Sequence, residues 1–280
     1  MSDTKSEEPK ILSPLIVYTV KCPVCEYEEV KCHTLKAKTL PMRHNVIEVP
    51  IYEENPKFHF VDFNELQFTV CPMCFFVGSN KNDFQSEDPI SRQFKESTSD
   101  RRILKYWNTN RDKIVQTYKS SSIKPENFEN PRTPEAVLLS YRLAIFKAKL
   151  EIQAKIPFAY FKRAHRFLRY YSMCMHYTNT ADNELLKKTV ADLEQVFLLS
   201  DFPDPVHEFE VCYLVVACSI KLQDEEKAGE WIKVLELTKA DLAGKAKENP
   251  KVPAQECAKW SQKAKDLWAN RNDESIWVFH

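Results

Sequence analysis

Two short Cys-Pro-X-Cys motifs are the residues whose type and spacing most clearly predict chemistry. They are Cys22-Pro-Val-Cys25 and Cys71-Pro-Met-Cys74, and 45 residues separate them. Each follows an apolar, β-branched run, so each motif is expected in a turn at the end of a strand. Two such turns can bring four thiolates to one tetrahedral metal ion, and four sulfur ligands are typical of zinc. The sequence therefore predicts one zinc site formed by these four cysteines.

Zinc bound by four thiolates keeps no coordination position for water, which predicts a structural rather than a catalytic ion. The alternative is a dithiol redox pair. A redox Cys-X-X-Cys motif opens a helix after a strand, whereas residues 26–30 alternate like a strand. Zinc is therefore the favoured interpretation. The sequence leaves open whether the metal is also contacted by Cys32, His33, His44 or His59.

The composition indicates a folded protein in which helices dominate. Of 280 residues, 43% are hydrophobic and 12% aromatic, as in proteins with a packed core. Only three glycines are present, too few for the positive-φ turns of a large meandering β protein. The 40 basic residues balance 40 acidic ones, so net charge favours no anionic partner. Nine cysteines without a signal peptide or an apolar span predict a cytoplasmic protein that crosses no membrane.

The order of patterns along the chain predicts an α+β fold, mostly α. Residues 1–13 are expected to be a disordered arm, 14–90 a zinc-ribbon-like β module with strands that include 57–63, 91–132 a connector with one helix, and 133–280 an α-helical repeat-like domain. A sheet as small as that of the module buries too little surface to be stable alone. Zinc would supply the missing stability.

Six helices are predicted after the connector, and their short loops favour antiparallel hairpins stacked in an array. Thr133-Pro134 and Asp204-Pro205 each place a capping side chain before a proline at the first helical position. The expected helices span 134–153, 157–178, 183–199, 205–222, 225–239 and 253–271.

One helical hairpin carries a repeat signature. Residues 211–232 resemble a degenerate tetratricopeptide unit, with Ala228 and Ile232 at the small and large positions of its second helix. Gln223 stands where the turn of such a unit usually has glycine. A tetratricopeptide-like array is therefore expected.

Together, the cysteine motifs, the run 64–74 and this hairpin resemble a family of bacterial cytosolic proteins of unknown function. Members of that family join an N-terminal split zinc-ribbon to tetratricopeptide-like helices. Families of this kind usually have glycine after the second cysteine of each motif, where this chain has Glu26 and Phe75. The resemblance implies a fold and a compartment, and it implies no activity.

Other polar groups give weaker indications of chemistry. No phosphate-binding loop, HExxH or GxSxG motif occurs, so no enzymatic activity is predicted. Acids at a helix start are expected from capping alone, which is the favoured interpretation of the group Asp201, Asp204, His207, Glu208 and Glu210. Small apolar core positions are expected for Cys174, Cys212, Cys218 and Cys257.

Basic residues are concentrated in the first two predicted helices of the array. Lys162, Arg166 and Arg169 form a polar stripe among aromatic residues, a composition compatible with nucleic-acid binding. The following segment, 181–210, is acidic, which favours mutual neutralisation of neighbouring helices instead. The apolar chain end is expected to fold back onto the last helices or to offer Trp277 and Phe279 to a partner.

The predicted function is a non-enzymatic scaffold or adaptor. The concave face of stacked helices would hold a protein or peptide, and the zinc module would add a second surface. The alternative is a nucleic-acid-binding or regulatory factor that uses the zinc ribbon and the basic helices. The sequence identifies no partner and no oligomeric state.

Overall fold

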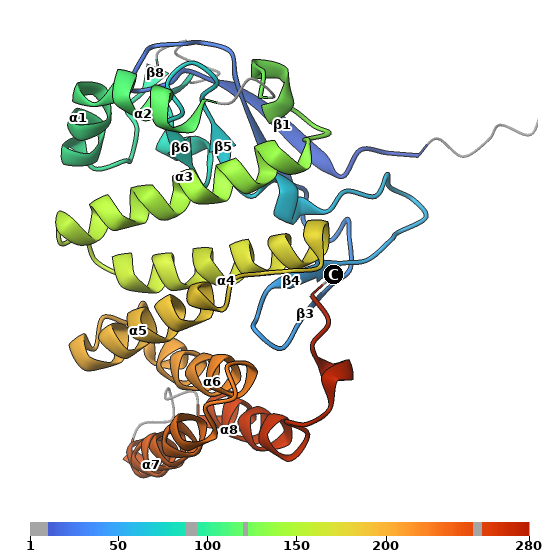
Figure 1. The fold of residues 1–280 in the computed structure, drawn as a ribbon, viewed down its shortest axis with the longest axis vertical. Coiled ribbons are helices and arrows are strands. Elements are labelled where there is room, and N and C mark those ends of the chain that lie inside the picture. Colours follow the sequence, from blue (N-terminus) through green and yellow to red (C-terminus); the bar gives the residue numbers. More distant parts are fainter. Residues whose placement is uncertain (1–10, 88–93, 120–122, 249–253, 280) are drawn as a thin grey trace, which may run out of the picture.

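A computed structural model of the chain describes residues 11–87, 94–119, 123–248 and 254–279. Small antiparallel strand pairs and short helices form a module at one end of a stack of long helices (Figure 1). The fold is α+β and mainly helical, as predicted. None of the helices in the described ranges combines the length and the apolar character needed to cross a membrane.

The β module consists of two-stranded antiparallel pairs. These are β1 (Leu15–Val20) with β2 (Val30–Leu35), β3 (Met42–His44) with β4 (Pro50–Tyr52), β5 (Thr69–Val70) with β6 (Val77–Gly78), and β7 (Ser86–Glu87) with β8 (Phe94–Lys95). Two 3₁₀ turns, η1 (Phe63–Leu66) and η2 (Lys81–Asp83), lie between strands.

The strand predicted at 57–63 is not formed. Phe58 makes only an isolated bridge to Leu12, and Phe60 is exposed. The alternating phenylalanines therefore do not mark a buried face. Residues 1–10 of the predicted arm lie outside the described residues, while Leu12 is joined to the module by this bridge.

The connector holds two α-helices where one was predicted. They are α1 (Arg101–Thr109) and α2 (Arg111–Tyr118), and the helix is interrupted at Asn110. Asp100 caps α1 by accepting a hydrogen bond from the backbone N–H of Arg102 at 2.8 Å. A further 3₁₀ turn, η3 (Pro125–Phe128), leads into the long helices.

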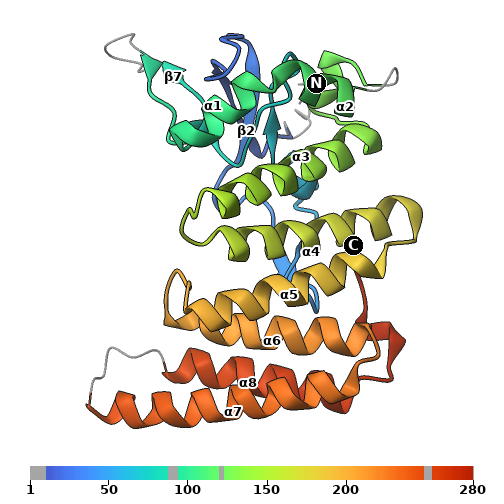
Figure 2. The same ribbon diagram turned by 60° about the vertical axis from the view of Figure 1, so that its left-hand side comes forward.

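The six predicted long helices are all present. They are α3 (Pro134–Gln153), α4 (Ala159–Thr178), α5 (Asn183–Leu199), α6 (Pro205–Lys221), α7 (Glu225–Glu248) and α8 (Ala254–Ala269), followed by a 3₁₀ turn, η4 (Glu274–Ile276). Thr133 and Asp204 cap α3 and α6 as expected. Successive helices pack side by side from α3 to α7, and α8 packs on α6 and α7 (Figure 2).

The hydrophobic core consists of two clusters of buried residues. One cluster joins the β module, α1, α2 and α3, and includes the buried residues Phe76, Trp107 and Tyr141. The other cluster joins α4 to α8. The buried face of α3 belongs mainly to the cluster of the module, and the domain boundary expected at 132 stays a prediction.

The β3–β4 hairpin lies against the helices rather than against the other strands. Its turn, residues 45–49, places Ile47 and Val49 in the second hydrophobic cluster, and both are buried. Tyr213 of α6 donates a hydrogen bond from its hydroxyl to the carbonyl oxygen of Val46 at 2.8 Å. In Figure 1 this hairpin and the C-terminal segment lie on the same side of the helix stack.

Candidate metal centre

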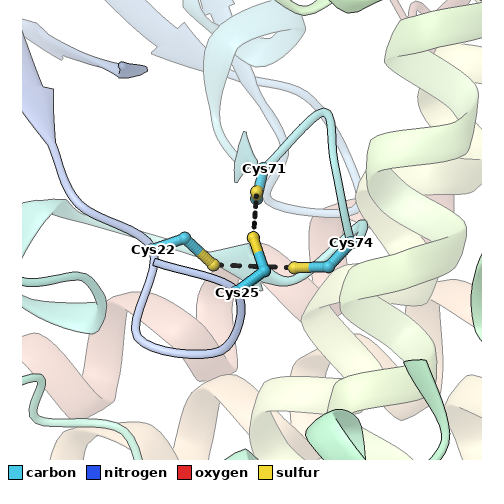
Figure 3. A group of neighbouring side chains, drawn as sticks. All are labelled: Cys22, Cys25, Cys71 and Cys74. Atoms are coloured by element: carbon cyan, nitrogen blue, oxygen red, sulfur yellow. Dashed lines mark hydrogen bonds between the residues drawn. The ribbon is translucent and has the colours of Figure 1, made fainter. Parts of the chain in front are cut away.

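The structure brings the two cysteine motifs together. The Sγ atoms of Cys22, Cys25, Cys71 and Cys74 all lie within 4.8 Å of one another. Cys22 is 3.5 Å from Cys74, and Cys25 is 3.5 Å from Cys71, so each short distance joins one motif to the other (Figure 3). Cys25 is partly exposed and the other three are buried. This group of sulfur atoms can hold a metal ion.

Both motifs have the same backbone conformation. In the first, the N–H of Glu26 donates to the carbonyl of Cys22 at 3.0 Å, and in the second, the N–H of Phe75 donates to the carbonyl of Cys71 at 2.9 Å. Glu26 has φ 63° and Phe75 has φ 59°. These are left-handed conformations, which cost a non-glycine residue roughly 1 kcal/mol or more. Both motifs therefore form the turn that usually has glycine at this position, although Glu26 and Phe75 stand there.

The electrostatics of four adjacent thiols favour a bound cation. The neighbouring sulfur atoms, together with burial, raise the pKa of Cys22 and Cys74. Four thiolates at these distances repel one another in the absence of a positive charge. A divalent metal ion removes this repulsion and deprotonates the thiols that coordinate it.

Aromatic packing ties the second motif to the connector. Trp107 of α1 donates a hydrogen bond from Nε1 to the carbonyl oxygen of Cys74 at 3.0 Å. Its ring meets that of Phe76 edge to face, with 5.5 Å between centroids. On the other side of the motif, Phe75 packs against Phe128 of η3.

The histidines and the fifth cysteine of the module do not join this group. Cys32 is buried in β2 opposite Tyr18, and His44 and His59 are exposed. His33 is buried, which lowers its pKa to about 4. Among the residues that the structure describes, Cys22, Cys25, Cys71 and Cys74 are the only close group of three or more metal-binding side chains.

The three basic residues considered for nucleic-acid binding have different environments. Lys162 is exposed, whereas Arg166 is only 8% exposed and donates from Nη1 to the carbonyl oxygen of Ala144 at 2.7 Å. Arg169 donates from Nη1 to the side-chain oxygens of Asn64 and Gln67. All three line one cavity. Nucleic-acid binding by them stays a prediction.

Mutual neutralisation of helices is visible between α4 and α5. Arg163 donates from Nε and Nη2 to the two carboxylate oxygens of Asp192, at 2.7 and 2.6 Å. The two hydrogen bonds form a bidentate ion pair between a helix of the basic segment and a helix of the acidic segment.

The acidic group near the start of α6 has structural contacts. Asp204 accepts hydrogen bonds from the N–H groups of the first turn, and Asp201 accepts one from the N–H of Phe158. Glu210 lies 3.6 Å from Nε2 of His165 and 3.9 Å from Nε2 of His207. Burial raises the pKa of Glu210 to about 7.

The contacts of several charged residues near α3 and α4 were not predicted from the sequence. Lys147 of α3 is 4% exposed, and its Nζ lies 3.5 Å from the carboxylate of Asp83 in η2. Glu151, one turn further along α3, lies 3.7 Å from Arg166. The sequence did contain a signal for these contacts. Lys147 and Glu151 lie four residues apart, so they share one face of α3, and the small residues Ala144 and Ala148 indicate that this face is buried.

The C-terminal segment is folded back onto the chain. Trp277 and Phe279 are buried, and Ser172 of α4 donates from its hydroxyl to the carbonyl oxygen of Phe279 at 2.8 Å. Binding of a partner by these two residues stays a prediction, and it would require the segment to detach. Three of the four remaining cysteines, Cys212, Cys218 and Cys257, are buried as expected, while Cys174 is partly exposed.

Fold and site together define a mainly helical α+β protein with a four-cysteine centre suited to a metal ion. The chain belongs to the family described as "Uncharacterized protein conserved in bacteria (DUF2225)", whose model matches residues 15–256. The match covers both cysteine motifs and confirms the resemblance to an uncharacterised bacterial family. It does not bear on the tetratricopeptide assignment. No curated protein and no solved structure shows significant similarity to the chain.

Proposed function

We propose that this protein is a non-enzymatic scaffold whose module is held together by one structural zinc ion. The observation that carries the proposal is the close four-sulfur group, three of whose cysteines are buried in the same hydrophobic core as α1 to α3. Four soft sulfur donors suit zinc, and zinc bound tetrahedrally by all four would have no position left for a reacting water molecule. The proposed zinc ion therefore stabilises the folded module and takes no part in catalysis.

A cytoplasmic location accords with the thiols. The four cysteines that would coordinate zinc form no disulfide, and neither do Cys32, Cys212 and Cys218. Free thiols and thiolate-bound zinc persist in a reducing compartment. We therefore place the protein in the cytoplasm.

The helical array supplies the surface for a protein or peptide partner. The hairpin of α6 and α7 has the features of a tetratricopeptide-like unit, because Gln223 adopts φ 61° at the turn and Ala228 is fully buried at the small position. Sequential helical hairpins build extended binding surfaces in repeat proteins.

One side of the array is already occupied by the chain itself. The turn 45–49 and the C-terminal segment with Phe279 both lie there. A partner therefore binds elsewhere or displaces one of them. Adjacent exposed leucines at the end of α5 offer an apolar contact, since Leu198 is 73% and Leu199 60% exposed.

The scaffold proposal is tested by affinity purification of the zinc-loaded full-length chain from its native cell. We expect a stoichiometric protein partner that is lost when Leu198 and Leu199 are both changed to glutamate. The matched control is Val17→Glu, which alters an exposed apolar residue on β1. Absence of any stoichiometric protein from the wild-type purification would count against the scaffold function.

The nucleic-acid alternative has less support. Arg166 is buried, and Arg163 is engaged by Asp192. Phosphates of a polymer lying on the surface would reach Lys162 more easily than these two groups. Steep salt-dependent retention on heparin, lost when Lys162, Arg166 and Arg169 are changed to glutamate, would favour that alternative.

A further inference from the structure

A cavity of about 340 Å³ lies between the module and the first two long helices. The module contributes Gln67 and Asn80, and α4 contributes Arg166 and Arg169. The cavity is separate from the four-cysteine group, and its residues have no part in the scaffold function proposed above.

The charged residues that line the cavity are mostly basic. Lys147, Lys162, Arg166 and Arg169 are opposed by only Asp83 and Glu151. His165, which also lines the cavity, is neutral at pH 7 because burial lowers its pKa to about 3. With four basic and two acidic side chains, the lining has an excess of two positive charges.

Two arginines in this lining keep unused hydrogen-bond donors. A guanidinium group has five N–H donors. Within the described part of the chain, the hydrogen bonds of Arg166 and Arg169 involve Nη1 alone, which donates to Ala144 in one case and to Asn64 and Gln67 in the other. Nε and Nη2 of both side chains therefore have no acceptor among the residues that the structure describes. Since Arg166 is 8% exposed, its donors are fixed in place at the cavity.

The two acidic residues of the lining each lie beside one of the two buried cations. Asp83 lies 3.5 Å from Lys147, and Ser99 accepts a hydrogen bond from the same ammonium group at 3.2 Å. Glu151 lies 3.7 Å from Arg166. Each acidic group thus holds one buried cation, while Lys162 and Arg169 have no described carboxylate within ion-pair distance and contribute the excess charge.

We propose that this cavity binds a small phosphorylated metabolite, with its phosphate group held by Arg166, Arg169 and Lys162. A phosphate monoester carries a charge near −2 at neutral pH, which matches the excess of the lining. A planar guanidinium group can donate two parallel hydrogen bonds to two oxygens of one phosphate. The hydroxyl of Ser79 and the Nδ2 group of Asn80, whose Oδ1 already accepts from the N–H of Asn82, line the cavity beside a polar remainder such as a sugar.

The size and burial of the site favour a small ligand over a polymer. A volume of about 340 Å³ lies within the range of small-molecule pockets. The phosphates of a nucleic-acid strand run over a surface and do not reach a side chain as enclosed as Arg166. Because the lining comes from η2 and from α4, bound ligand would also tie the module to the helices.

The test uses the zinc-loaded full-length protein and isothermal titration with two probes, inorganic phosphate and glucose 6-phosphate, at constant ionic strength. We expect one saturable site per chain, with tighter binding of the sugar phosphate. Arg169→Ala should weaken binding of both probes about tenfold or more, because it removes a charged donor. The matched control is Arg142→Ala, an exposed arginine on α3 outside the cavity, which should leave binding unchanged.

A second variant protects the test against loss of structure. Lys162 is exposed on α4, so Lys162→Ala should fold normally by circular dichroism and still weaken phosphate binding severalfold. Absence of saturable phosphate binding would overturn the proposal. It would equally be overturned if Arg142→Ala weakened binding as much as Arg169→Ala, or if a single-stranded RNA oligonucleotide bound more tightly than the sugar phosphate with a steep salt dependence.

Discussion

The indole Nε1 of Trp107 lies 3.0 Å from the carbonyl oxygen of Cys74, to which it donates a hydrogen bond. This contact connects the first connector helix to the last of the four cysteines. The indole ring is fully buried, and it packs against Phe76 of the module and Phe146 of α3. One side chain thus joins the four-cysteine group, the connector and the long helices.

Replacing Trp107 with phenylalanine tests this connection. The variant keeps most of the apolar contact but leaves the Cys74 carbonyl without its donor and opens a small cavity. We expect a loss of about 1–3 kcal/mol in the free energy of unfolding, measured by urea titration. Trp260→Phe is the control, because that indole is half-buried and makes no hydrogen bond to the described residues. Equal losses in both variants would count against a contribution of the hydrogen bond to stability.

Metal content is the most direct check on the four-cysteine group. We expect one zinc per chain in the purified wild-type protein by elemental analysis, and none in Cys71→Ser, since three thiolates bind zinc much more weakly than four. The variant should also lose the folded module, because metal binding contributes to folding. Cys174→Ser changes a partly exposed cysteine outside the group and should keep its zinc. A well-folded wild-type protein without metal would refute the zinc assignment.

The fold was largely predictable because its signals are local. Caps such as Thr133 and Asp204 mark helix starts wherever the helix then packs. The interruption at Asn110 carries no comparably strong signal. The alternation at 57–63 indicated a strand, but a strand needs a partner, and Phe58 finds only an isolated bridge.

The four-cysteine group was predictable from the sequence, whereas the cavity was not. Identical spacing in two motifs is sufficient to pair Cys22 and Cys25 with Cys71 and Cys74. The cavity was not predictable, because Asp83 and Lys147 meet through tertiary packing of η2 on α3. The charge pattern identified Arg166 and Arg169 as a basic stripe, yet only the packed structure distinguishes a buried arginine from a surface one.

Glu210 should make stability depend on pH. Its pKa in the folded protein is about 7, above its ordinary value of 4.5, so the folded state holds the proton more tightly than the unfolded state. The free energy of unfolding therefore falls as the pH rises from 4.5 to about 7. Glu210→Gln removes that cost and should be more stable than the wild type at pH 8, by roughly 1–3 kcal/mol, with little difference at pH 4.5.

Urea titrations at pH 4.5 and pH 8 check this expectation. The control is Glu230→Gln, which changes an exposed glutamate of α7 and should shift neither value by more than about 0.5 kcal/mol. A Glu210→Gln variant less stable than the wild type at pH 8 would mean that the folded protein stabilises the ionised carboxylate, which would contradict the raised pKa.

The C-terminal segment offers a comparison between neighbouring residues. Phe279 is 7% exposed and packs edge to face on Tyr171 with 5.4 Å between ring centroids, whereas Val278 is 42% exposed. Phe279→Ala should lower the free energy of unfolding by about 1–3 kcal/mol through lost packing. Val278→Ala should change it by less than about 1 kcal/mol. Similar losses at both positions would contradict the docked arrangement of the segment.

The hairpin turn at 45–49 also sets the order in which the chain can finish folding. Its contacts with Tyr213 and Lys263 join residues 167 and 215 positions apart. Such distant contacts form late, because closing a long loop is costly before other structure exists. During synthesis the turn emerges well before α6 and α8. Its apolar residues Ile47 and Val49 belong to the cluster of α4 to α8, so they remain without their final partners, and open to aggregation, until these helices have left the ribosome.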